Sequence, residues 1–170
     1  MIGESRRAGS SWGTGLATLG PIDKCPVAPG TAGSLVGFAA YYLLVHFEIL
    51  PDFGYWIACV TLPLLAVPIC HAAEKSMGRK DPSEIVLDEF AVIPLCFIGT
   101  IIPSRIPSME SEQVFAWLSA GFVLFRFFDV VKPLGIRASQ RLPNGWGVVL
   151  DDVLAAFCTC GCLNLGWRWL

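Results

Sequence analysis

The chain has 170 residues, which is the length of a single domain, and carries a formal net charge of −2. Its composition is 54% hydrophobic and 15% charged, with a mean hydropathy of +0.60. These values exclude an ordinary soluble domain and predict an integral membrane protein. The sequence has no basic patch with interleaved aromatic residues, so we expect no nucleic-acid partner.

Five apolar runs follow a polar segment of residues 1–32 that is rich in Gly and Pro. The runs cover residues 35–50, 53–73, 90–103, 113–125 and 153–167. As a helix, the third run is only ~21 Å long against a hydrocarbon core of ~30 Å, so either flanking residues extend it or it is partly re-entrant. We predict an all-α fold, a polytopic transmembrane bundle of about five short helices, in one domain over residues 1–170.

The Lys and Arg residues predict the orientation of this bundle. If the N-terminus is cytoplasmic and all five runs cross, only Arg105 and Arg168 lie on the outer side. The inner side then holds the other basic residues: Arg6, Arg7, Lys24, Lys75, Arg79, Lys80, Arg126, Lys132, Arg137 and Arg141. The same arrangement places every polar motif on the inner side. We therefore expect residues 1–32 to be a cytoplasmic segment and the functional site to face the cytoplasm.

The densest acidic cluster lies just before the third apolar run and contains Asp81, Glu84, Asp88 and Glu89. Carboxylates at the entrance of a membrane helix are costly to desolvate, so they usually pair, bind a cation or do chemistry. Alternatively, they cap a helix start, where the macrodipole favours negative charge. The local sequence leaves both interpretations open.

Two further polar groups accompany this cluster. Arg126, Asp129 and Lys132 recur every three residues on one helix face, where they can hold a phosphate and a metal, or form a snorkelling basic end with an internal ion pair. The pair Asp151-Asp152 is either a helix cap or a pair of metal ligands. Hard carboxylate oxygens suit Mg²⁺ better than zinc. Three acidic groups with basic partners on one side of the membrane indicate metal-assisted phosphoryl chemistry.

The segment from Pro29 to Ser34 is a small-residue turn that enters the first run. Its open N–H groups and the helix N-terminus can bind a phosphate near Gly30, Thr31 and Ser34. An ordinary cap by Thr31 or Ser34 is the simpler interpretation of this turn alone. No Gly-Lys-Ser/Thr follows, so the turn is not a P-loop.

Four alternative interpretations of the sequence are disfavoured. Cys162 and Arg168 have the spacing of a cysteine phosphatase loop, but bulky residues between them leave no room for a phosphate cradle. The cysteines at positions 158, 160 and 162 cannot share one helix face, so a zinc site is not expected. A CDP-alcohol phosphotransferase needs an Asp-Gly-x2-Ala-Arg stretch, which is absent. A transporter or a subunit of a larger assembly would have polar residues at mid-membrane, whereas here the charges gather at one face.

Four segments, in this order, resemble the phosphatidylglycerophosphatase A family of bacterial membrane lipid phosphatases: PGTAGSL at 29–35, DPSEIVLDEF at 81–90, FRFFDVVKP at 125–133 and GWGVVLDD at 145–152. That family removes the phosphate from phosphatidylglycerophosphate and requires Mg²⁺. The resemblance therefore implies a phospholipid substrate, an Mg²⁺ cofactor and a place in the bacterial cytoplasmic membrane. The chain departs from the family pattern at Val92, Gly135 and Asn144-Gly145, where the family usually has Gly, Pro and Gly-Gly.

The resemblance and the charge pattern lead to one expected site. We expect five carboxylates to be both catalytic and metal-binding: Asp88, Glu89, Asp129, Asp151 and Asp152. We expect five other residues to bind the substrate: Gly30, Thr31, Ser34, Arg126 and Lys132. A metal-activated water and a phospho-aspartate intermediate both fit this set, and the sequence leaves the number of metal ions and the oligomeric state open.

Overall fold

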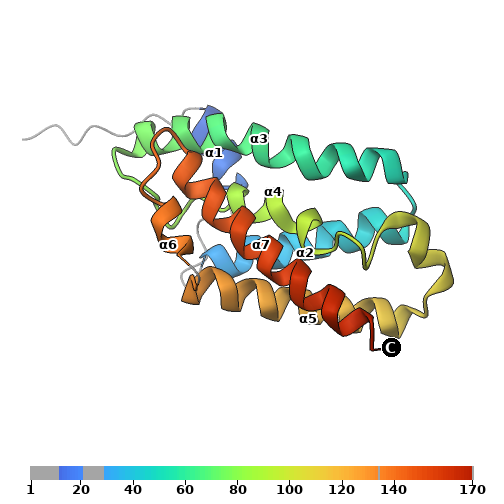
Figure 1. Cartoon of the computed structure of the whole chain (residues 1–170). Helices are drawn as coiled ribbons and strands as arrows, with labels where there is room; N and C mark the ends of the chain where they lie inside the picture. The colour runs from blue at the N-terminus through green and yellow to red at the C-terminus, as the bar shows by residue number, and fades with distance from the viewer. Residues whose placement is uncertain (1–11, 21–28, 134, 170) are drawn as a thin grey trace, which may run out of the picture.

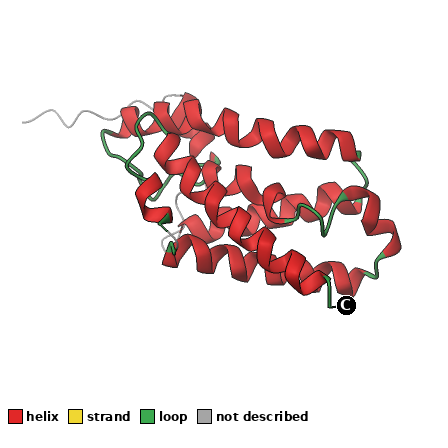
Figure 2. Cartoon of the chain, viewed as in Figure 1, coloured by secondary structure: helices red, strands yellow, loops and turns green. Residues whose placement is uncertain are grey.

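The computed structural model describes residues 12–20, 29–133 and 135–169, and every regular element within them is a helix (Figure 2). In chain order the elements are α1 (Trp12–Ala17), α2 (Pro29–His46), α3 (Asp52–Met77), α4 (Leu87–Cys96), η2 (Pro103–Ser108), α5 (Ser111–Val131), α6 (Ile136–Ser139) and α7 (Trp146–Trp167). The predicted all-α bundle is confirmed. Its five predicted helices correspond to α2, α3, α4, α5 and α7, and the short elements α1, η2 and α6 were not predicted.

Four long helices lie alongside one another and give the bundle its length (Figure 1). Among the described residues, α3, α5 and α7 are long and apolar enough to span a membrane, and α2 runs beside them with 18 residues. Their outward side chains are apolar: Phe53, Phe115 and Val123 are 77%, 70% and 64% exposed. Such a surface is stable only against lipid, and the chain is a membrane protein.

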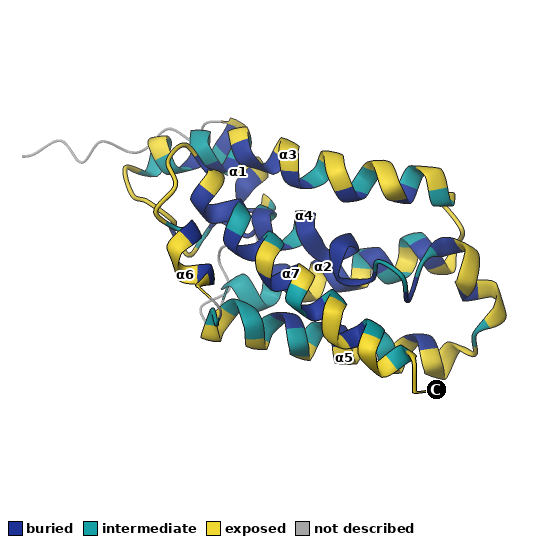
Figure 3. Cartoon of the chain, viewed as in Figure 1, coloured by how far each residue is buried: buried dark blue, intermediate teal, exposed yellow. Residues whose placement is uncertain are grey.

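The third crossing is built differently from the other four. Its helix, α4, has only 10 residues and lies buried at the centre of the bundle (Figure 3). Residues 97–102 continue to the opposite end without forming a helix. Pro94 lies inside α4 and lacks a backbone donor, and Gly99 has a φ of +85°, so the helix ends between them. A predicted helix over the whole of residues 90–103 is therefore wrong, although the segment still crosses the bundle.

The interruption frees backbone carbonyl groups in an apolar interior, and side chains from three helices satisfy them. Tyr55 on α3 donates its hydroxyl to Pro94 O at 2.9 Å, and Tyr41 on α2 donates to Ile101 O at 2.5 Å. Asn164 on α7 donates its amide to Ile98 O at 2.7 Å. Non-helical backbone at membrane depth persists only with such internal partners. These three donors therefore stabilise the broken crossing.

All four sequence motifs lie at one end of the bundle, which we call the motif end. The N-termini of α2, α4 and α7 meet there with the C-termini of α3 and α5 (Figure 1). Arg105 and Arg168 lie at the opposite end, where Arg105 stacks over Trp167 at 5.8 Å. The described basic residues of the motif end are Lys75, Arg79, Lys80, Arg126, Lys132, Arg137 and Arg141, and the predicted inner residues at positions 6, 7 and 24 lie outside the described part. The charge asymmetry between the two ends therefore agrees with the prediction.

Candidate active site

A cavity of about 270 Å³ opens at the motif end between α2, α4, α5 and α7. The five carboxylates predicted to be catalytic all line it, although they come from three helices. Asp88 and Glu89 lie in the first turn of α4, and the Asp151-Asp152 pair lies in the second turn of α7. Because both helices begin at this end, their acidic pairs reach the same cavity.

The structure bears on the two interpretations of the α4 carboxylates. The N-cap residue of α4 is Val86, and no side chain caps the helix by a hydrogen bond. Asp88 and Glu89 lie in the first turn, where the macrodipole favours their charge, but they are only 5% and 9% exposed and face the cavity. They are therefore not hydrogen-bonded caps. Glu84, from the same sequence cluster, instead pairs with Arg79 at 2.6 Å on the exposed surface and does not line the cavity.

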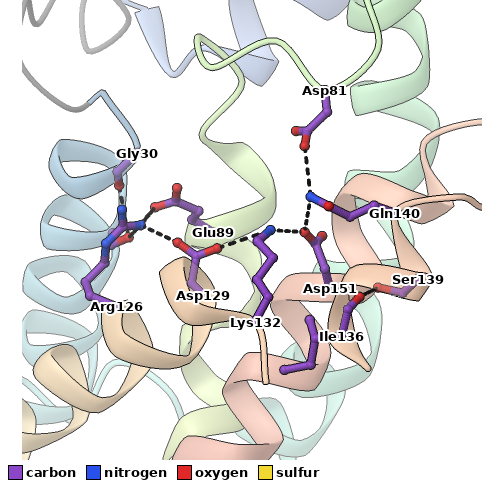
Figure 4. A network of polar contacts seen from close by, with 11 residues as sticks. Gly30, Asp81, Glu89, Arg126, Asp129, Lys132, Ile136, Ser139, Gln140 and Asp151 are labelled. Atoms are coloured by element: carbon purple, nitrogen blue, oxygen red, sulfur yellow. Dashed lines mark hydrogen bonds and ion pairs between the residues drawn. The ribbon is translucent and has the colours of Figure 1, made fainter. Parts of the chain in front are cut away.

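Arg126 holds one side of the cavity together (Figure 4). Its Nη1 atom lies 3.0 Å from Glu89 Oε2 and 2.8 Å from Asp129 Oδ2, and it donates to Ser34 Oγ at 3.2 Å. Ser34 also contacts the Glu89 carboxylate directly. Because Arg126 is on α5, Ser34 on α2 and Glu89 on α4, this network joins three of the helices that build the cavity.

Gly30 brings the first turn of α2 against the same carboxylate. A Cβ atom placed on Gly30 would collide with Oε1 of Glu89. A side chain at this position would therefore force the Glu89 carboxylate, which Arg126 and Ser34 hold, to shift. Thr31, the next residue, is half-buried and does not line the cavity. Of the predicted substrate-binding residues, Gly30, Arg126 and Lys132 line the cavity, and Ser34 lies behind it against Arg126.

Lys132 holds the other side of the cavity (Figure 4). Its Nζ atom pairs with the Asp151 carboxylate and lies 3.6 Å from Asp129 Oδ1. Burial lowers the pKa of Lys132, but the neighbouring carboxylates of Asp151, Asp152 and Asp129 outweigh this effect and raise the pKa overall. The side chain is therefore a permanent cation at neutral pH.

Gln140 is a member of this network that the sequence did not reveal. Its Nε2 atom donates to Asp151 Oδ2 at 3.0 Å and to Asp81 Oδ2 at 3.3 Å, and so connects α7 to the loop before α4 (Figure 4). A single neutral residue in the mixed segment between α5 and α7 has no spacing or charge pattern that marks it. Only the fold brings it to the cavity.

Six carboxylates line the cavity, the five predicted ones and Asp81, and they outnumber the two lining cations, Arg126 and Lys132. Among the described residues, Asp88 Oδ1 and Asp151 Oδ1 are buried side-chain oxygens with no hydrogen-bond partner. Leaving a buried carboxylate oxygen without a donor or cation is costly. Oxygen atoms of this kind are the ligands that Mg²⁺ takes, so the residues present fit this cation. Within the described residues, no group of three or more acidic, His or Cys side chains is placed so that it could hold a metal ion as it stands, so the fit rests on residue type and not on the present geometry.

None of the described cysteines lines the cavity. Cys162 is exposed on α7, roughly 16 Å along the helix from Asp151. The described cysteines at positions 59, 70, 96, 158, 160 and 162 are all free. The sequence interpretation that set aside a cysteine phosphatase agrees with this placement.

Comparison with known proteins identifies the family. The sequence profile of the phosphatidylglycerophosphatase A family matches residues 15–167, which is nearly the whole chain. The chain belongs to this family. It is 38% identical over 130 residues to phosphatidylglycerophosphatase A of Haemophilus influenzae, covering 76% of this chain and 72% of that protein. It is 34% identical over 146 residues to phosphatidylglycerophosphatase A of Escherichia coli, covering 85% of this chain and 77% of that protein.

A third relative has a different name. A protein of Bacteroides thetaiotaomicron, provisionally named phosphatidylinositol-3-phosphatase, is 34% identical over 153 residues, with 86% of this chain and 83% of that protein covered. No solved structure gave a significant match. The chain is therefore a phospholipid phosphatase of the phosphatidylglycerophosphatase A family, and its relatives differ in the lipid that their names give.

The sequence departures from the usual family pattern have local structural meaning. Asn144 and Gly145 stand where the family usually has two glycines, and both have positive φ values, of 61° and 79°. Asn tolerates this conformation better than most residues, while a Cβ on Gly145 would collide with Val67 O. Gly135 stands where the family usually has Pro and has a φ of +81°, which Pro cannot adopt. A Pro at this position would therefore need a different backbone conformation before α6.

Proposed function

We propose that this phosphatase acts on phosphatidylglycerophosphate at the cytoplasmic face of the bacterial inner membrane. In the reaction, a water oxygen bonds to phosphorus while the bond from phosphorus to the glycerol oxygen breaks. The departing oxygen gains a proton, and the products are phosphatidylglycerol and inorganic phosphate. The observation that carries this proposal is the cavity of buried carboxylates and two cations at the end of a lipid-facing bundle.

Arg126 and Lys132 have the positive charge that a phosphate dianion needs in this cavity. A guanidinium has five N–H donors in a planar fork, so Arg126 can keep Glu89 in place and still donate to a phosphate oxygen. Lys132 is held by Asp151 and Asp129, which fix its ammonium group at the cavity. We assign phosphate binding to these two side chains, with Gly30 and Ser34 shaping the wall around Arg126.

Asp88, Glu89, Asp129 and the Asp151-Asp152 pair would hold Mg²⁺, because they supply oxygen ligands and their charge exceeds that of the two cations. When bound, Mg²⁺ neutralises charge on the phosphate and makes water a better nucleophile. Without added positive charge these carboxylates would repel the phosphate. The buried carboxylates thus serve to concentrate cations, and the two basic side chains orient the phosphate among them.

The test compares lipid phosphomonoesters in the same mixed micelles. Purified full-length protein with Mg²⁺ is given phosphatidylglycerophosphate, phosphatidylinositol 3-phosphate or phosphatidic acid at equal surface concentration, and phosphate release is followed. The second lipid is included because a relative that is 34% identical to this chain is named for it. We expect kcat/KM to be at least about tenfold higher for phosphatidylglycerophosphate, a preference of ~1.4 kcal/mol, and activity to disappear with a chelator.

The outcomes separate substrate from reaction class. A preference for phosphatidylinositol 3-phosphate would replace the proposed substrate while leaving the reaction class intact. Full activity after removal of divalent cations would contradict the metal role of the carboxylates. The Arg126→Gln and Arg79→Gln variants form a matched pair, since only the first arginine lines the cavity. We expect the cavity variant alone to lose activity.

A further inference from the structure

A lipid-facing groove of about 410 Å³ lies between α2 and α5. Leu35, Phe38 and Tyr42 line it from α2, and Phe122 and Val123 line it from α5. Leu35 and Val123 are 57% and 64% exposed, so the groove opens sideways toward the hydrocarbon, whereas Phe38 is buried at its floor. Its walls are almost entirely apolar, which suits a hydrocarbon chain and no polar ligand.

The groove lies on the same two helices as the phosphate-binding side of the cavity, one turn deeper in the bundle. Leu35 directly follows Ser34, whose hydroxyl group contacts both Glu89 and Arg126. Phe122 precedes Arg126 by four residues, about one helical turn or ~6 Å along α5. The groove therefore begins one turn below Arg126, on the membrane side of the side chain to which we assign phosphate binding.

Charge distinguishes this groove from a second one of similar size. An apolar groove of about 400 Å³ between α3 and α7 is lined by Trp56, Leu64, Val149 and Phe157. The cavity wall contributed by α7 carries Asp151 and Asp152, with Lys132 paired to Asp151, whereas the wall contributed by α2 and α5 carries Gly30, Arg126 and Asp129. The first wall thus has two carboxylates beside one cation, and the second has one carboxylate beside one cation. A phosphate dianion approaching between α2 and α5 would meet less negative charge than one approaching past α7. The route between α2 and α5 is therefore electrostatically favoured.

We propose that the α2–α5 groove binds an acyl chain of the phospholipid substrate while the phosphomonoester occupies the cavity above it. This inference rests on the proposed function, since it takes a membrane phospholipid with a terminal phosphate as the ligand. The groove holds the lipid by its chain, and Arg126 then receives the phosphate. Substrate would thus enter sideways from the bilayer without passing through water.

Photolabelling tests this placement without requiring turnover. The probe is a phosphonate analogue of phosphatidylglycerophosphate, in which CH₂ replaces the ester oxygen and one acyl chain carries a diazirine. Full-length protein with Mg²⁺ in phosphatidylcholine vesicles is irradiated with this probe or with diazirine-labelled phosphatidylcholine, and labelled residues are mapped by mass spectrometry. We expect the phosphonate probe to enrich labelling at the α2–α5 groove over the α3–α7 groove at least fivefold relative to the phosphatidylcholine probe.

Three results would overturn the proposal. Equal labelling ratios with the two probes would mean that only bulk lipid fills the groove. Enrichment at the α3–α7 groove would move the substrate chain there. Absence of labelling in this groove with both probes would mean that lipid does not enter it. Phosphate release from unmodified lipid tests the proposed function separately. An active enzyme without enriched labelling would contradict the groove proposal and leave the proposed function standing.

A matched pair of substitutions gives a second, kinetic test. Ser119 lines the groove and is exposed, whereas its neighbour Ala120 is equally exposed to lipid but lines neither groove. Ser119→Phe fills the groove, and we expect its kcat/KM for long-chain phosphatidylglycerophosphate to fall at least tenfold. Ala120→Phe should retain the wild-type value, and both proteins should elute and melt as wild type. Equal kcat/KM for the two folded variants would contradict the proposal.

Discussion

Asp88 has one side-chain oxygen buried without a partner, at the second position of a helix whose N-cap is Val86. A cap would tolerate Asn as well as Asp, whereas a ligand of a hard cation needs the charge. We predict that Asp88→Asn lowers phosphate release at least ~10²-fold, because even outer-shell changes at metal sites cost 10–100-fold. The protein should still insert, purify and show wild-type helicity by circular dichroism. Near-normal turnover would show that Asp88 is outside the reacting centre.

Gly30 tests the close approach between α2 and α4. A methyl group at this position would displace the Glu89 carboxylate and, with it, the ion pair to Arg126. We predict that Gly30→Ala lowers kcat/KM by roughly tenfold, equivalent to ~1.4 kcal/mol of transition-state binding. Thr31→Ala is the matched control on the same turn, since Thr31 does not line the cavity. Equal losses in the two variants would indicate a role for the whole turn, as the sequence alone had predicted.

At the residue scale, the sequence was most informative where charged residues adjoin apolar runs. The carboxylates next to apolar runs could be singled out because ionised groups at a membrane boundary need a reason. Gln140 could not, because a neutral residue in a polar loop is ordinary in any protein. Gly30 was predicted from its motif, but as a phosphate contact, whereas the structure adds its packing against Glu89. Residue type thus predicted which side chains form the site, whereas their contact partners could be read only from the fold.

At the scale of elements, hydropathy predicted the crossings. The short third run left open whether flanking residues extend it or it is partly re-entrant, and it did not show where its helix ends. An apolar run reads as one continuous helix, because neither Pro94 nor Gly99 alone is decisive in a membrane protein. The partners that stabilise the break lie on α2, α3 and α7, far away in sequence. The boundary at Cys96 therefore depends on tertiary contacts that no local pattern contains. The same limit hid the short elements α1, η2 and α6.

Tyr41 provides a test of the broken crossing. Its hydroxyl group, fully inside the bundle, donates to Ile101 O, and its ring stacks on Phe97 at 5.0 Å. Tyr41→Phe keeps the ring and leaves the carbonyl group without this donor. We predict a loss of ~1–2 kcal/mol of unfolding free energy, measured by denaturant titration in detergent. Tyr42→Phe is the control, since the ring of half-buried Tyr42 stacks on His46 and, among the described residues, its hydroxyl group makes no hydrogen bond, so the substitution should be nearly neutral.

At the scale of the whole molecule, chain direction explains why four distant motifs form one site. α2 and α4 begin at the motif end, α5 ends there, and α7 begins there, so each motif is the terminus of a crossing (Figure 1). Helix termini are the places where a membrane bundle can expose polar groups to water. The sequence predicted this gathering because successive crossings alternate in direction, which brings every second loop to the same end. This alternation holds in the structure because the broken third crossing still reaches the opposite end.

The last prediction concerns the side of the membrane that the motif end faces. We predict that the motif end is cytoplasmic, because Arg and Lys residues of short loops are retained on that side. The described motif end carries seven of them, at positions 75, 79, 80, 126, 132, 137 and 141, and the opposite end carries Arg105 and Arg168. A single cysteine at Gly78, in a background without native cysteines, should resist an impermeant maleimide in intact cells and react after permeabilisation. A cysteine at Ser108 should react with the maleimide already in intact cells, because η2 lies at the opposite end of the bundle. Ready labelling at position 78 in intact cells would place the carboxylate cavity on the outer face and contradict both the orientation and a cytoplasmic source of substrate.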